Sequence, residues 1–249
     1  LGSCASLEPK ARLAAVGEPE LRALVAELAS DGFEGRMPGT IGEQRTLAFL
    51  ETELKRRGAS GIAPGGGYRM AFTVPAQQKP VPRAQPGLPA GQQDFLKAVN
   101  AAGAITSHNI LGRVAGRRPD GKVVLVMAHW DHLGHCRPPG ETDRVCNGAV
   151  DNASGVAAVL TLIGRVRALG LDRDVLFLFT SAEEWGLLGA KAFAAAPPVP
   201  LETIVAGFNL DMIAVAPAEA PVAVVAEAGS PLIPLVRAAA RAMKRGWDG

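Results

Sequence analysis

Continuous apolar runs alternate with helical patterns through the second half of the chain, and this alternation constrains the fold more than any other feature. The runs are "KVVLVMAH" (122–129), "DVLFLFTS" (174–181) and "TIVAGFNLD" (203–211). Unbroken apolar runs of this length are typical of strands that are buried on both faces of a parallel sheet. Between them lie "SGVAAVLTLIGRVRALG" (154–170) and "GLLGAKAFAAA" (186–196), which favour helices. The pattern predicts an α/β domain with a mostly parallel central sheet flanked by helices.

Further elements are expected on both sides of this region. Apolar residues at helical spacing predict helices over 8–29, with a break near Gly17, and over 41–58, ending at Gly58. "HNILGRVAG" (108–116) and "PVAVVAE" (221–227) are interpreted as strands, and "SPLIPLVRAAARAMKR" (230–245) as a closing helix. Ser154 is expected to cap the helix that follows it, and Gly170 to end it.

Length and composition favour one large domain. The chain has 249 residues, of which 48% are hydrophobic, so a full core can be buried. We expect a tail at residues 1–6, a single domain over 7–249, and an irregular insertion or lid at about 59–105, where proline and glycine are frequent. The net charge of +2 argues against a nucleic-acid partner. No apolar run approaches the about 18 residues that a membrane-spanning helix needs.

The three cysteines point to an extracytoplasmic protein. "LGSC" (1–4) resembles the lipobox at which bacterial lipoprotein signal peptides are cleaved, which would make Cys4 a lipidated residue and attach the protein to a membrane. Cys136 and Cys146 are ten residues apart in a polar segment, and a disulfide between them fits an oxidising compartment such as the periplasm. Two free thiols, or a metal site that also uses His135, are the alternatives.

Acidic residues and a histidine follow the predicted strands directly. They are His129 and Asp131 after the first run, Glu183 and Glu184 after the second, Asp211 at the end of the third, and Asp151 just before a helix. In open α/β sheets, ligands bind outside the carboxyl ends of the strands, so these side chains are expected to meet at one edge. Five carboxylates at one edge would repel each other without a cation between them. A divalent metal is therefore expected, and imidazole with carboxylates suits catalytic zinc, with cobalt or manganese as substitutes.

Each residue also has an ordinary structural interpretation. Asp151 alone would be read as a helix N-cap, Glu183 and Glu184 as acids favoured in a first helical turn, and His129 as a core histidine. Asp211 is harder to explain in this way, because "FNLDM" places a charge between apolar neighbours. The combination favours the metal site.

Four motifs in order resemble the zinc-dependent aminopeptidases of peptidase family M28. They are "AHWDHLG" (128–134), "NGAVDNASGV" (147–156), "TSAEEWGLLGA" (180–190) and "FNLDM" (208–212), and the segment over 28–58 is similar to the N-terminal part of bacterial members. The resemblance implies a zinc exopeptidase fold of the phosphorylase/hydrolase-like type, peptide substrates and two zinc ions. It assigns one zinc to His129 and Asp211, a bridging role to Asp151, and the other zinc to Glu184. Asp131 would orient the imidazole, Glu183 would be the general base, and His132 would match the pattern without being a ligand.

One part of the family pattern is missing. Family members take a further zinc ligand from a histidine downstream of the "NLDM" aspartate, and no histidine follows His135 here. We expect that the domain over 7–249 is incomplete at its C-terminus; a genuine loss would leave one metal weakly held by Asp151 and Glu184. The leading hypothesis is a metallopeptidase that removes N-terminal residues from peptides. A single-zinc enzyme similar to glutaminyl cyclases and a metal-free binding domain on the same fold are the alternatives.

Overall fold

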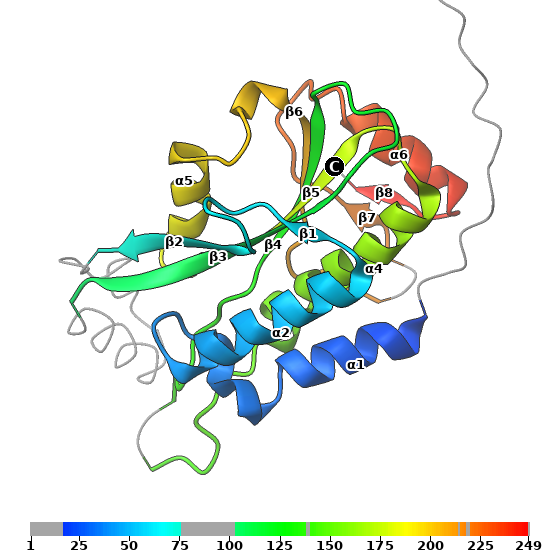
Figure 1. The fold of residues 1–249 in the computed structure, drawn as a ribbon. Coiled ribbons are helices and arrows are strands. Elements are labelled where there is room, and N and C mark those ends of the chain that lie inside the picture. The colour runs from blue at the N-terminus through cyan, green and yellow to red at the C-terminus, as the bar shows by residue number, and fades with distance from the viewer. Residues whose placement is uncertain (1–16, 76–102, 138–139, 214, 218–219, 249) are drawn as a thin grey trace, which may run out of the picture.

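A mixed sheet forms the centre of the computed structural model, which describes residues 17–75, 103–137, 140–213, 215–217 and 220–248 (Figure 1). Its strand order is β1-β3-β5-β4-β6, and β2 pairs with β3 beside this path. The strands are β1 (Ser60–Gly61), β2 (Arg69–Val74), β3 (Ile105–Val114), β4 (Val123–His129), β5 (Asp174–Thr180) and β6 (Ile204–Asn209). All three apolar runs are strands, as predicted.

The sheet is parallel in one half and antiparallel in the other. β4 pairs in parallel with β5 and β6, whereas β3 is antiparallel to β5, β2 and β1. The predicted α/β class is confirmed, and the parallel part is limited to the three strands whose carboxyl ends carry the candidate residues. The expected irregular insertion at about 59–105 is wrong at its beginning, because β1 and β2 belong to the sheet. Met70 and Val74 alternate inward along β2, a pattern too short to stand out among the neighbouring glycines. Residues 76–102 lie outside the described part of the chain.

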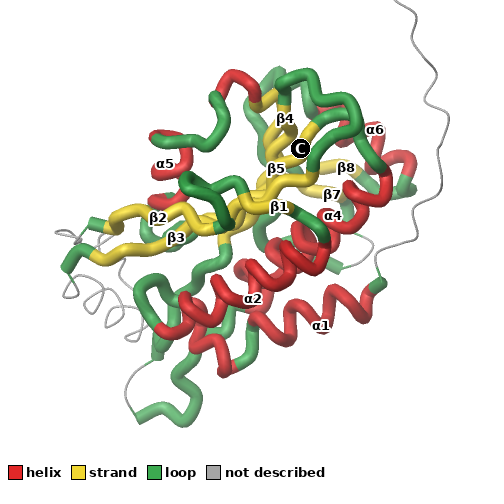
Figure 2. The backbone as a smooth tube through the Cα atoms, in the orientation of Figure 1, coloured by secondary structure: helices red, strands yellow, loops and turns green. Residues whose placement is uncertain are grey.

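Helices cover both faces of the sheet. Helices α1 (Glu18–Leu28), α2 (Ile41–Arg57) and α4 (Gly155–Leu169) lie together on one face, and Figure 2 shows them below the strands. α5 (Leu188–Ala195) packs on the opposite face through Phe193. The Thr40 hydroxyl caps α2 by accepting a hydrogen bond from the Gly42 amide, and glycines in the left-handed conformation end α2 and α4. The first half of the helix expected over 8–29 lies outside the described residues.

Short elements complete the chain. They are the helical turns η1 (Asp31–Arg36), η2 (Ala149–Ser154) and η3 (Leu201–Thr203), the helix α6 (Ile233–Ala242), and a two-stranded parallel sheet of β7 (Val222–Ala223) and β8 (Trp247–Asp248). Only two residues of the strand expected over 221–227 form β7. Ser154 does not cap α4 as expected; its hydroxyl donates to the Val150 carbonyl instead, at 2.6 Å.

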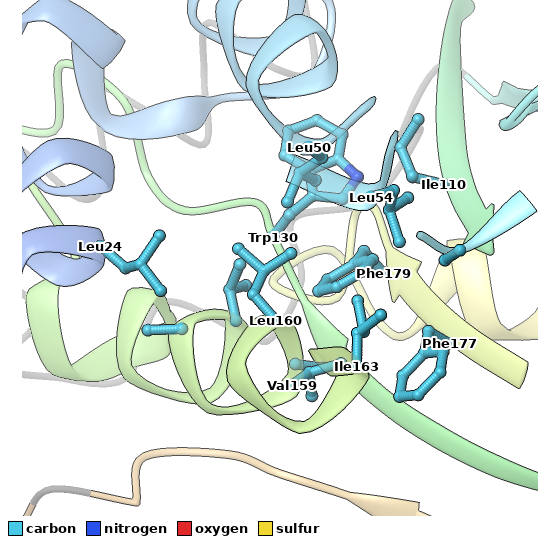
Figure 3. Packing of buried hydrophobic residues seen from close by; sticks show 14 of the residues in the cluster. Leu24, Leu50, Leu54, Ile110, Trp130, Val159, Leu160, Ile163, Phe177 and Phe179 are labelled. Atoms are coloured by element: carbon cyan, nitrogen blue, oxygen red, sulfur yellow. The ribbon is translucent and has the colours of Figure 1, made fainter. Parts of the chain in front are cut away.

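β5 is the centre of the core, because all seven of its residues are buried. Phe177 and Phe179 point toward the face covered by α1, α2 and α4, where they pack near Leu160 (Figure 3), while Leu176 and Leu178 face α5. Each fully buried side chain of this size contributes about 1.5–3 kcal/mol. This packing fixes the ends of β4 and β5, where the candidate residues begin.

α4 is a core helix although its composition also fits a membrane span. The stretch Ala149–Leu169 is long enough to cross a bilayer and contains an 18-residue window with a mean hydropathy of 1.2, but 61% of that window is buried within the domain. Its buried face packs against α1, α2 and β4. Burial of this kind is what a helix beneath a central sheet requires.

Candidate metal centre

His129 is the last residue of β4, and its ring faces carboxylates from two other segments. Nε2 lies 3.2 Å from Asp151 Oδ1 and 3.4 Å from Asp211 Oδ1. The histidine side chain is 2% exposed, whereas that of Asp211 is 39% exposed. One ligand atom from each of these residues lies within 4.8 Å of the others, so a single ion can contact all three. A nitrogen and two carboxylate oxygens, without a thiolate, form a donor set that fits zinc.

A second group of donors lies beside the first. His132, Asp151 and Glu184 also place one ligand atom each within 4.8 Å of one another, and His132 Nδ1 is 2.6 Å from Glu184 Oε1. The family resemblance gave His132 no role as a ligand, yet it is the nitrogen donor nearest Glu184 here. Asp151 belongs to both groups. The described residues thus form two adjacent donor groups that share one carboxylate, as two neighbouring metal ions require.

Asp131 links the end of β4 to the turn that follows β5. It is completely buried, and its carboxylate accepts hydrogen bonds from the backbone amides of Glu183, at 3.2 Å, and Glu184, at 3.4 Å. The Asp131 group nearest His129 Nδ1 is its main-chain carbonyl, at 3.2 Å, while the carboxylate oxygen is 3.7 Å away. Asp131 therefore holds the adjacent glutamates in place, and its backbone and side chain both lie beside the imidazole.

Asn152 joins the Asp151 segment to the end of β6. Its side-chain amide donates to the Leu210 carbonyl at 2.9 Å, and its oxygen accepts hydrogen bonds from the amides of Gly155, at 2.9 Å, and Met212, at 3.3 Å. A Cβ atom at position 155 would collide with the Leu210 carbonyl, so glycine permits this close approach. Asp151 and Asp211 are thus brought together through the residues next to them.

The cluster shifts the proton affinities of its members. Burial lowers the pKa of His129, but the nearby carboxylates of Asp131 and Asp151 outweigh this effect and raise the pKa to about 11. The same contact with His129 lowers the pKa of Asp151. Burial raises the pKa of Glu183, and the neighbouring carboxylates raise it further against the opposing effect of His129.

All six residues predicted to form the site come together at the carboxyl ends of the parallel strands: His129, Asp131, Asp151, Glu183, Glu184 and Asp211. Sequence reasoning missed Arg36, a buried cation beside the cluster. Its only signal was its position in the glycine-rich segment "SDGFEGRMPGT".

The cysteine segment lies next to the site. Cys136 and Cys146 form a disulfide with a Cα–Cα distance of 5.8 Å, and the Cys146 amide donates to the Gly134 carbonyl. His135 is half exposed and lies 4.0 Å from Glu34. Cys4 lies outside the described residues.

Comparisons with known proteins agree with this arrangement. Residues 109–247 match the family profile described as "Peptidase family M28". The vacuolar membrane protease of Vanderwaltozyma polyspora is 33% identical over 105 residues, which make up 41% of this chain and 10% of that protein. The chain thus spans about a tenth of the length of this yeast relative.

Three solved structures show the same fold. A zinc-dependent exopeptidase from Parabacteroides distasonis has a TM-score of 0.65 at 23% identity, covering 90% of this chain and 72% of that one. A zinc aminopeptidase from Bacillus subtilis has a TM-score of 0.66 at 16% identity, covering 93% and 80%. A glutaminyl cyclase from Bacteroides thetaiotaomicron has a TM-score of 0.61 at 20% identity, covering 92% and 75%. Since all are below 25% identity, they establish the fold alone.

Proposed function

Because the chain belongs to peptidase family M28, we propose that it is a zinc-dependent exopeptidase that removes N-terminal residues from peptides. The observation that carries this proposal is the pair of donor groups that share Asp151. Two zinc ions held there would polarise the scissile carbonyl and lower the pKa of a water molecule that attacks it.

We assign the ligands by these contacts. His129 and Asp211 would hold one ion and Glu184 the other, Asp151 would serve both donor groups, and His132 lies beside Glu184. These are nitrogen and oxygen donors from four segments, which is the ligand chemistry of catalytic zinc sites. Asp131 holds the backbone of Glu183 and Glu184 in place by accepting hydrogen bonds from their amides.

Glu183 is the proposed general base. It belongs to neither donor group, and burial raises the pKa of its carboxyl. A carboxylate with a raised pKa is suited to accept a proton from the attacking water and to return it to the amine that leaves. The two adjacent glutamates thus have different proposed roles: Glu184 is a metal ligand, and Glu183 accepts the proton of the attacking water.

Removal of N-terminal residues is the reaction that we propose first among those known for this fold. A zinc aminopeptidase has the same fold, and the family match covers the four motifs that carry the proposed site. Glutaminyl cyclisation is the second candidate, because a glutaminyl cyclase has the same fold. Retention of both donor groups favours hydrolysis over a single-zinc reaction.

We also propose an extracytoplasmic location. The disulfide between Cys136 and Cys146 is of a kind that persists in oxidising compartments. Lipidation of Cys4 would anchor the protein to a membrane, and a mass measurement of the mature N-terminus tests this directly.

The experiment combines metal analysis with two substrates, using the full natural protein. We expect two zinc ions per chain, release of a chromophore from an aminoacyl substrate, and loss of this activity after chelation. Glu183→Gln is expected to retain zinc and lower kcat by about 10²–10⁴-fold. Glu202→Gln, which alters an exposed glutamate on η3, is the matched control and should behave as wild type. Conversion of N-terminal glutamine peptides without hydrolysis would establish the cyclase instead, and absence of both zinc and turnover would establish a metal-free domain.

A further inference from the structure

Arg36, at the end of η1, is completely buried and uses its guanidinium to bind main-chain carbonyls. The four hydrogen bonds run from Nε to Trp130 O at 2.9 Å, from Nη1 to Leu28 O at 2.7 Å and Asn147 O at 2.6 Å, and from Nη2 to Gly148 O at 2.8 Å. Every nitrogen of the guanidinium is therefore used. Among side chains, only the planar fork of arginine offers donors in this arrangement.

Three of the four bound carbonyls belong to two of the segments that carry metal donors, the β4 end and the Asp151 segment. Trp130 lies between His129 and Asp131 in the chain. Asn147 and Gly148 immediately precede η2, which contains Asp151. The fourth partner, Leu28, is the last residue of α1 and connects both segments to the helical layer. A single side chain therefore holds the β4 end and the Asp151 segment at a fixed separation.

Main-chain contacts keep the arginine in this position. The Arg36 carbonyl accepts a hydrogen bond from the His132 amide at 3.3 Å, and the Gly35 carbonyl accepts one from the Gly134 amide at 3.0 Å. Gly35 has a φ of 65°, and a Cβ there would lie 2.6 Å from the Cys146 carbonyl. A side chain at position 35 would therefore displace Gly134 and Cys146, and the two main-chain hydrogen bonds tie the loop to the segment that follows β4.

The charge of Arg36 also matters for the cluster. Burial lowers its pKa to about 10, against the opposing effects of Asp131, Asp151 and Glu184, so the guanidinium remains protonated at neutral pH. A buried cation close to crowded carboxylates reduces their mutual repulsion. Because each guanidinium nitrogen donates to a main-chain carbonyl, Arg36 acts on the centre through other residues.

We infer that Arg36 is a positioning residue for the metal centre: it joins the β4 end to the Asp151 segment, so that the two donor groups are already formed before metal binds. This inference rests on the proposed function. It concerns the affinity and geometry of metal binding rather than the chemical step.

Two substitutions test the inference, and a third serves as control. Arg36→Met removes the charge and the hydrogen-bond donors, while Arg36→Lys keeps the charge but lacks the planar guanidinium that reaches several carbonyls at once. Arg45→Gln is the matched control, because Arg45 binds the Gly32 carbonyl of the same loop and does not contact the donor segments. On the full natural protein, zinc affinity is measured by competition with a chromogenic chelator. The visible spectrum of the cobalt-loaded protein reports ligand geometry, and circular dichroism of the metal-free protein reports folding.

We expect folded Arg36→Met to bind zinc about 10–100-fold more weakly and to show an altered cobalt spectrum, as happens when groups that orient metal ligands are lost. Arg36→Lys should recover part of the affinity, and Arg45→Gln should match wild type. Unchanged zinc affinity and cobalt spectrum in both Arg36 variants would overturn the inference. So would failure of both variants to fold, with or without zinc, because the role would then be purely structural. A wild-type protein without zinc affinity would overturn the proposed function itself, and this inference with it.

Discussion

Replacing Asn152 by alanine tests how the Asp151 segment is attached to β6. The side-chain amide makes two hydrogen bonds of 2.9 Å, to Leu210 O and from the Gly155 amide, and a weaker one of 3.3 Å from the Met212 amide. A hydrogen bond contributes about 0.5–1.5 kcal/mol net, and a buried group left without a partner costs about 1–3 kcal/mol. Since Asn152 is completely buried, water cannot easily replace its amide. We expect Asn152→Ala to lower the free energy of unfolding by about 2–4 kcal/mol.

The assay is urea unfolding of the metal-free protein, followed by circular dichroism, with the slope m compared between variants. Asn147→Ala is the matched control, because its side-chain amide makes an exposed hydrogen bond to Asp31. The control should change stability by less than about 0.5 kcal/mol. Zinc affinity of Asn152→Ala should also fall, since Asp151 and Asp211 lose their common support. A loss of stability no larger than that of the control would refute the reasoning.

Three other predictions follow from the fold. Phe177→Ala should lower the free energy of unfolding by about 3–5 kcal/mol in thermal or urea unfolding, because it leaves a cavity in the core beneath β5; a loss below 1 kcal/mol would show that this core is loosely packed. The hydrogen bond from Arg56 holds the pKa of Glu53 below its ordinary value despite the opposing effect of burial. Ionised Glu53 therefore stabilises the folded protein above pH 4.5, and this contribution is lost as pH falls through the lowered pKa. Glu53→Gln should therefore flatten the dependence of stability on pH below about 4.5, and an unaltered slope there would contradict this. Reduction of the disulfide between Cys136 and Cys146, which closes a loop of ten residues, should lower stability by about 2–3 kcal/mol, and equal stability in the two redox states would argue against it.

The parallel half of the fold could be predicted because its strands are continuous apolar runs, although only β4 and β5 are largely buried. The runs that form β4, β5 and β6 can be identified as strands from their own residues alone. Because ligands bind at the carboxyl ends of such strands, the position of the acidic residues could be predicted as well. The antiparallel β2 was missed because its inward residues, Met70 and Val74, are surrounded by glycine and proline. Its pairing with β3 depends on contacts that only the folded chain provides.

The donor residues could likewise be predicted from their chemistry, whereas their supports could not. His129 and Asp151 belong to types that bind metal, so position and type together indicated their role. Arg36 binds backbone carbonyls that are up to 112 residues away, and a carbonyl has no sequence signature. The proximity of His132 to Glu184 depends on the path of the chain after β4. Supports of this kind become visible only when the loops are placed in space.

β5 is buried and β6 is exposed, which implies that the site is built on strands that unfold locally to different extents. Every residue of β5 is buried, and this strand has partners on both sides, whereas β6 is half exposed along its length. Amide hydrogens on β5 should exchange with solvent only during global unfolding, while those on β6 should exchange through smaller local openings. His129 and Glu184 therefore stand on the slowly exchanging part of the protein, and Asp211 on the part that opens first.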